Sequence, residues 1–155
     1  MEKNIWKSKA YKNTKVDYVK SQSAIARLLE NNEIYEKQFT DSLEQNKSQI
    51  TFIKPLEFEG RRIKIGVKIT IPQVNEKNRN QLYRALFYYL KAKFESLTFG
   101  FVEEYNEAFV KEFMPYLITD KQGRTVADLI LPKFIEAIDY TKEGEILHIE
   151  DKSEK

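Results

Sequence analysis

The stretch that decides the fold is RRIKIGVKITI, residues 61–71. Its isoleucine and valine side chains alternate with charged or small residues, which is the period of a β-strand with one buried face. The preceding run, residues 49–59, is also rich in β-branched and aromatic residues, and Glu59-Gly60 lies at the junction. Because glycine takes the positive φ of a tight turn, we predict a β-hairpin, which Pro72 ends.

A short helix and a third strand are predicted before this hairpin. Ser21 is a plausible N-cap, and the helix that follows it stops at Asn31-Asn32. Its apolar residues recur at helical spacing: Ile25, Leu28 and Leu29. Residues 33–40 have a period closer to two and predict a strand, which the polar loop 41–47 joins to the hairpin.

A long helix is predicted after the hairpin. Its apolar stripe consists of Leu82, Leu86, Tyr89, Leu90, Phe94 and Leu97. Arg84, Tyr88 and Lys91 share another face at i, i+4 and i+7, with Tyr83 and Phe87 near its border. This second face is therefore expected to be both cationic and aromatic.

The remainder of the chain is predicted to be mixed. Gly100 interrupts the helical pattern, which resumes and runs to about Met114. Residues 120–123 predict a turn, either in a small hairpin or in a loop, before a last helix over 129–138 that Pro132 kinks or shortens.

These elements predict one α+β domain: a short helix, a three-stranded antiparallel sheet, a long aromatic-rich helix and a mixed C-terminal extension. The length of 155 residues suits a single core. We place a basic N-terminal arm at residues 1–14, the domain at 15–140 and a charged tail at 141–155. The order helix, three strands, helix is similar to that of a double-stranded RNA module, but element order alone implies no function.

Charge is divided along the chain. Residues 1–93 carry 19 Lys and Arg against 10 Asp and Glu, a net charge of +9, whereas residues 94–155 carry 7 against 14, a net charge of −7. A basic body with an acidic C-terminal part points to a polyanionic partner that stays away from the tail.

Signatures of catalysis are lacking in the sequence. The chain has no cysteine and a single histidine, and it contains no phosphate loop, nucleophile elbow or two-histidine zinc helix. We therefore expect a protein that is not an enzyme and uses no cofactor or metal. The sequence also shows no secretory signal and no run of ~18 apolar residues, so we expect a cytoplasmic protein without a membrane partner.

The leading hypothesis is that the protein binds nucleic acid, single-stranded in preference to double-stranded, without base-specific readout. Cations that follow phosphates and aromatic rings that stack on bases are the combination found in single-strand binders. The candidate residues are Arg61, Arg62, Lys64, Lys68, Arg84, Tyr88, Lys91 and Lys93. The plainer interpretation is that Glu57 and Glu59 neutralise the hairpin cations as cross-strand pairs.

The alternative hypothesis is a protein-binding inhibitor of a host defence or of host nucleic-acid machinery. A dense row of carboxylates can imitate a phosphate backbone and occupy a partner's nucleic-acid channel. The candidate residues are Glu103, Glu104, Glu107 and Glu112, and an exposed aromatic patch is a second candidate surface. A self-complementary face on the aromatic helix would also permit a homodimer.

Several sequence blocks resemble a family of short, uncharacterised proteins common in phage and prophage genomes. The blocks are Tyr83-Arg84-Ala85-Leu86, Leu90-Lys91-Ala92-Lys93-Phe94-Glu95, Phe113-Met114-Pro115-Tyr116, Gly123-Arg124-Thr125-Val126 and Leu131-Pro132. The resemblance spans most of residues 15–138, and this chain carries about one extra helical turn before Pro115. It implies a phage or mobile-element origin and supplies no catalytic residues.

Overall fold

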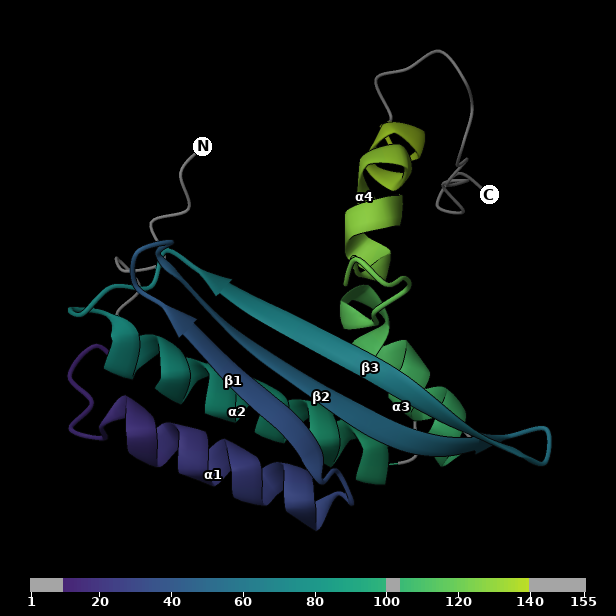
Figure 1. Cartoon of the computed structure of the whole chain (residues 1–155), viewed down its shortest axis with the longest axis horizontal. Coiled ribbons are helices and arrows are strands. Elements are labelled where there is room, and N and C mark those ends of the chain that lie inside the picture. Colours follow the sequence, from purple (N-terminus) through teal and green to yellow (C-terminus); the bar gives the residue numbers. More distant parts are fainter. Residues whose placement is uncertain (1–9, 100–103, 140–155) are drawn as a thin grey trace, which may run out of the picture.

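A computed structural model of the chain describes residues 10–99 and 104–139 (Figure 1). The elements follow in the order α1 (Tyr18–Asn31), β1 (Glu36–Ser42), β2 (Lys47–Phe58), β3 (Arg61–Pro72), α2 (Arg79–Thr98), α3 (Tyr105–Phe113), the 3₁₀ helix η2 (Met114–Tyr116) and α4 (Val126–Ala137). Helices and an antiparallel sheet in this arrangement confirm the predicted α+β class.

The hairpin that the sequence predicted is the longest part of the sheet. Strands β2 and β3 pair from Lys47↔Pro72 to Phe58↔Arg61, which leaves a two-residue turn. Both turn residues have positive φ, 49° at Glu59 and 73° at Gly60. Positive φ at both positions is the type I′ geometry, whose twist matches that of the strands, so the predicted turn is confirmed.

The sheet has the order β1-β2-β3. Helices α1 and α2 lie side by side against one face, and no described helix lies on the other, which we call the open face (Figure 1). Ile118 and Gly123 contact this open face at Gly66 and Lys68. Alternation along β2 and β3 sends one set of side chains into the helical layer, where they form the core with residues of α1, α2 and α3. The core includes Ile25, Leu29, Ile50, Phe52, Val67, Ile69, Tyr83, Leu86, Leu90, Phe94, Phe109 and Phe113.

Helix α1 begins four residues earlier than predicted, at Tyr18 rather than after an N-cap at Ser21. Ser21 is not its N-cap but a fully buried residue within the helix. The N-cap position is Asp17, and the amide of Tyr18 donates to the Asn80 side-chain oxygen of α2 at 2.8 Å. A partner that is distant in sequence therefore satisfies one of the free amides of the first turn, and local patterns do not reveal it.

Two tyrosines of α2 have exposures that are the reverse of those predicted. Tyr83, predicted at the border of the exposed face, is 1% exposed, and its ring lies 5.8 Å from that of Tyr18. Tyr89, predicted in the apolar stripe, is 41% exposed. The reason is that α2 packs against α1 as well as against the sheet, which rotates its buried stripe towards α1.

The connection between η2 and α4 lies along the β3 edge of the sheet. The Ile118 amide donates to the Gly66 carbonyl at 2.8 Å, and Leu117 pairs with Val67 in an isolated antiparallel bridge. A Cβ at Gly66 would lie 3.1 Å from Cδ1 of Ile118, so glycine allows this close approach. The predicted turn over 120–123 is closed by one bridge, Ile118↔Thr125, which makes it a minimal hairpin.

Helix α4 also begins three residues before its predicted start. Thr125 and Asp128 form a capping box, in which each side chain accepts from the other residue's amide. The helix includes Pro132 in its interior. It stands away from the sheet and from α1 and α2 (Figure 1), and in the described part of the chain it contributes no buried residue.

Candidate nucleic-acid interface

The predicted hairpin cations lie on the open face of the sheet. Arg62, Lys64 and Lys68 alternate with core-facing residues of β3, so their side chains leave the sheet on the side without helices. Arg61 follows the turn directly and is also exposed. The hairpin thus presents its cations away from α2.

Two of the four hairpin cations already have partners. Lys64 Nζ lies 3.5 Å from the Glu36 carboxylate of β1, and Lys68 Nζ donates to the Gly123 carbonyl. Among residues 10–99 and 104–139, no carboxylate lies within salt-bridge distance of Arg61 or Arg62. The expected pairing of Lys64 with Glu57 or Glu59 is therefore wrong, because β1 supplies the carboxylate instead.

A shallow hollow on the open face contains both signs of charge. Arg62 and Lys64 line it with the exposed Tyr35 and two carboxylates, Glu33 and Glu36, around a volume of about 150 Å³. These carboxylates oppose a phosphate at the same place. The hollow is therefore a weaker anion site than its two cations alone suggest.

The second predicted group lies on the solvent side of α2. Arg84 donates to the Tyr88 hydroxyl at 3.0 Å, and its guanidinium lies 4.8 Å from the centre of the Tyr88 ring and 5.0 Å from that of Phe87. Lys91 is half-exposed, and its Nζ lies 3.8 Å from the Glu95 carboxylate one turn further on. The structure thus joins Arg84 and Tyr88 directly, with Lys91 on the next turn.

The ring of Tyr88 is stacked by a residue that sequence reasoning did not select. Tyr11 lies parallel to it, with ring centroids 5.2 Å apart and an interplanar angle of 7°. Tyr11 precedes α1 and is separated from Tyr88 by the whole sheet in sequence, so no local pattern could show the contact. Both rings remain partly exposed, at 40% for Tyr11 and 37% for Tyr88.

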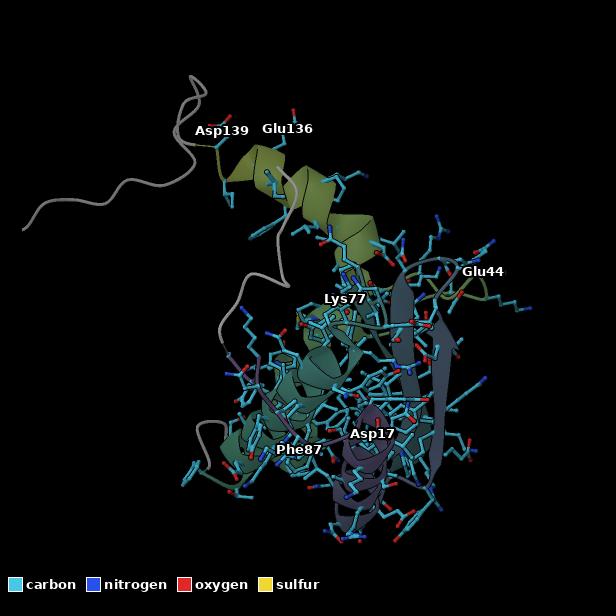
Figure 2. All side chains as sticks on the ribbon, turned by 90° about the vertical axis from the view of Figure 1, so that its left-hand side faces the viewer. Asp17, Glu44, Lys77, Phe87, Glu136 and Asp139 are labelled. Carbon is cyan, nitrogen blue, oxygen red and sulfur yellow. The ribbon has the colours of Figure 1, made fainter. Side chains whose placement is uncertain are left out.

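The N-terminal segment extends this surface towards the start of α2. The Gln81 side chain donates to the Ala10 carbonyl at 2.8 Å and so fixes the segment against the helix. Beside this contact, Lys12 and Lys77 line a hollow of about 460 Å³ with Asn75, Asn78 and Gln81. Figure 2 shows Phe87 and Lys77 on the helical side of the molecule. We call the surface formed by Tyr11, Lys12, Lys77, Arg84, Phe87, Tyr88 and Lys91 the α2 face.

Lys93 does not belong to the α2 face. Its Nζ lies 3.1 Å from the Glu112 carboxylate and 4.8 Å from the centre of the Tyr89 ring. Tyr116 closes this cluster through a 2.5 Å contact between its hydroxyl and that of Tyr89. Burial, followed by this hydroxyl contact, raises the pKa of Tyr116 to about 12. Lys93 therefore joins α2 to α3 and η2 and is engaged within the protein.

The predicted acidic face is less uniform than the sequence suggests. Glu104 and Glu107 are exposed, whereas Glu112 is held by Lys93. Glu103 lies outside the described residues. In the region that the structure describes, this leaves two exposed carboxylates on or beside α3, Glu104 and Glu107, and Glu107 lines a hollow with Glu57 and Lys111.

Seven of the eight predicted residues therefore form two separate groups, and Lys93 belongs to neither. Arg61, Arg62, Lys64 and Lys68 face outward from the sheet, whereas Arg84, Tyr88 and Lys91 lie on the solvent side of α2. One short ligand cannot lie flat on both. Of the two groups, only the α2 face combines exposed cations with a parallel ring stack.

Comparisons with known proteins give no relative: no protein-family model, curated protein or solved structure matches this chain. Within the described ranges, no group of three or more His, Cys, Asp or Glu side chains is placed to hold a metal ion. None of the described helices is long and apolar enough to span a membrane.

Proposed function

We propose that the protein binds single-stranded nucleic acid on the α2 face without reading its base sequence. The observation that carries this proposal is the Tyr11–Tyr88 ring stack, over which the Arg84 guanidinium lies. Every base has a π-face, and stacking of a base on an aromatic side chain contributes ~1–3 kcal/mol. A base can take the place of one tyrosine in this stack, or extend it.

Cations on both sides of the stack support the same proposal. Lys12 and Lys77 lie towards the start of α2, and Lys91 lies one turn beyond Tyr88. Lysine and arginine side chains bind a phosphate backbone largely by releasing its condensed counterions. Phosphates on either side of a stacked base would thus meet positive charge.

The sequence of the N-terminal arm adds to this positive charge. Lys3, Lys7 and Lys9 precede Tyr11, with Glu2 as the single carboxylate among the first nine residues. The arm is attached to the α2 face at Tyr11 and at the Ala10 carbonyl. The sequence that leads into this attachment point is therefore cationic, as a phosphate-binding surface requires.

We further propose that the protein acts as an accessory protein of a phage or mobile element, as the sequence resemblance implies. The alternative, an inhibitor that binds a host protein through its acidic side chains, has less support. Its proposed carboxylate row includes Glu112, whose charge Lys93 already neutralises at 3.1 Å.

Two matched double variants test which surface binds. Arg84→Glu with Lys91→Glu reverses two charges on the α2 face, and Arg61→Glu with Arg62→Glu makes the same charge change on the hairpin. We expect at least a tenfold weaker affinity for a labelled single-stranded oligonucleotide in the first variant and a much smaller loss in the second, because only the first removes cations beside the ring stack.

Fluorescence anisotropy at ~50 mM salt measures both affinities, and circular dichroism checks that each variant is folded. An equal loss in the two variants would mean that net charge alone governs binding. A loss confined to the hairpin variant would move the site to the open face of the sheet and contradict the proposal.

A further inference from the structure

Helix α4 exposes more apolar surface than any other described element. Six large apolar side chains of α4 and its C-cap are between 39% and 56% exposed: Leu129, Ile130, Leu131, Phe134, Ile135 and Ile138. These side chains are spread around the circumference of the helix and do not form a single apolar stripe. A helix that is apolar on all sides is normally buried, and the described residues leave this one exposed.

Helix α4 projects from the rest of the protein, and we call it the α4 arm. Its first turn is fixed by the capping box and by η2, and it then extends away from the body (Figure 1). Glu136 and Asp139 mark the end farthest from the body (Figure 2). A 12-residue helix is close to the length at which isolated helices become marginal in water, so contacts with another surface would be needed to hold it.

The body of the protein offers an apolar hollow that its own arm does not fill. It lies between the hairpin and α3 and is lined by the apolar side chains of Leu56, Phe58, Ile63, Ile65, Val110 and Met114. Its volume is about 210 Å³, below the ~300–1,000 Å³ of typical small-molecule sites, which suits inserted side chains better than a free ligand.

We propose that α4 is exchanged between two copies of this chain, each inserting its arm into the hollow of the other. An arm and a hollow at different places on one chain can close into a twofold dimer when both contacts form at once. The apolar side chains of Leu131 and Phe134 would then meet those of Ile63 and Phe58.

Charges at the two surfaces are compatible with this pairing. Glu57, Glu107 and Lys111 line the hollow together with its apolar residues, and α4 carries Asp128, Lys133 and Glu136. Each surface therefore offers both signs of charge to the other. An anionic lipid surface suits α4 less well, since its one lysine is outnumbered by acidic residues.

The available apolar area sets an upper limit that reaches the size of a stable dimer interface. The exposed fractions of the six residues add up to about three fully exposed side chains. With roughly 150 Å² for a large side chain, two arms and the surfaces that cover them would bury at most about 1,800 Å², if all six side chains were covered completely. Stable interfaces bury ~1,200–2,000 Å² in total.

Cysteine cross-linking tests the contact directly, because the natural chain contains no cysteine. Phe134→Cys places a thiol on the arm and Phe58→Cys places one at the hollow. We expect a disulfide-linked dimer on mild oxidation of the mixed variants, and much less from either variant alone. Preferential self-linking of Phe134→Cys would show that two arms pair with each other, which would overturn the proposed exchange.

The mass in solution gives a second test that does not depend on a thiol. Sedimentation equilibrium should give twice the 18.4 kDa of one chain. Leu131→Glu with Phe134→Glu, and separately Ile63→Glu with Phe58→Glu, should each give monomers, whereas Phe99→Glu, a change at a residue 71% exposed elsewhere, should stay dimeric.

Mixing the arm variant with the hollow variant should restore a weaker dimer, since one intact arm still meets one intact hollow. A wild-type chain that remains monomeric at ~100 μM, where a stable interface should be occupied, would overturn the proposal. So would a monomer whose α4 binds lipid vesicles.

Discussion

Lys54 shows how a single residue can be misjudged from a strand pattern. It lies at a core-facing position of β2 and is 4% exposed. Its Nζ donates to the Asn32 carbonyl at 2.8 Å, just beyond the end of α1, and lies 5.3 Å from the centre of the Tyr105 ring. The alternation along β2 predicts that the Lys54 side chain points towards the core. It does not predict that a carbonyl at the end of α1 accepts a hydrogen bond from the Lys54 ammonium group.

The burial of Lys54 predicts a pH dependence of stability. Loss of solvent lowers the pKa of Lys54 below its ordinary value of 10.5, while the nearby Glu33 carboxylate partly opposes the change. Between the lowered pKa and 10.5, the unfolded chain still binds a proton that the folded chain has released, so the free energy of unfolding rises with pH. Below the lowered pKa this contribution is constant.

Urea unfolding of the wild type and of Lys54→Met measures this effect. We expect the wild type to gain stability relative to Lys54→Met as the pH rises from neutral towards 10.5. Other titrating groups are the same in both proteins and cancel in the difference. A difference that does not change over this pH range would mean that Lys54 keeps its ordinary pKa.

The elements differ in how far their sequences determine them. The hairpin follows from period-two alternation and a Glu59-Gly60 turn, which are local signals. The start of α1 depends on Asn80, and the burial of Tyr83 depends on α1, so neither could be read locally. The start of α4 had a readable signal that was missed, the Thr125-x-x-Asp128 capping box.

The capping box of α4 predicts the effect of Asp128→Ala. The backbone amide of Thr125 donates to the Asp128 carboxylate at 2.9 Å, and this contact is the main reason why the pKa of Asp128 lies below its usual value of 3.8. Its contribution is therefore present above 3.8 and is lost as the pH falls through the lowered pKa. Removing the box should cost the helix about 1 kcal/mol.

Amide hydrogen exchange over residues 126–137 measures that cost. We expect faster exchange in Asp128→Ala and nearly unchanged exchange in Lys133→Ala, which alters an exposed α4 residue outside the capping box. Equal exchange rates in the wild type, Asp128→Ala and Lys133→Ala would show that the capping box does not stabilise α4.

At the scale of the whole molecule, only some of the cations that the sequence concentrates in residues 1–93 are available on the surface for a ligand. Lys68 and Lys93 are bound within the protein, Lys64 pairs with Glu36 and Lys91 pairs with Glu95, so four of the seven predicted cations contact a carboxylate or a carbonyl of the protein. Sequence reasoning correctly grouped Arg84, Tyr88 and Lys91 on one face of α2. It could not find Tyr11, Lys12 and Lys77, because folding brings them to that face from other segments.

The salt dependence of oligonucleotide binding tests the central claim most directly. Four cations of the α2 face, Lys12, Lys77, Arg84 and Lys91, are placed to contact phosphates. For single strands, each phosphate neutralised contributes about −0.7 to the slope of log K against log salt, so we predict a slope of about −3. No binding of a single strand at ~50 mM salt, or binding whose affinity does not change between ~50 and ~200 mM, would contradict the account.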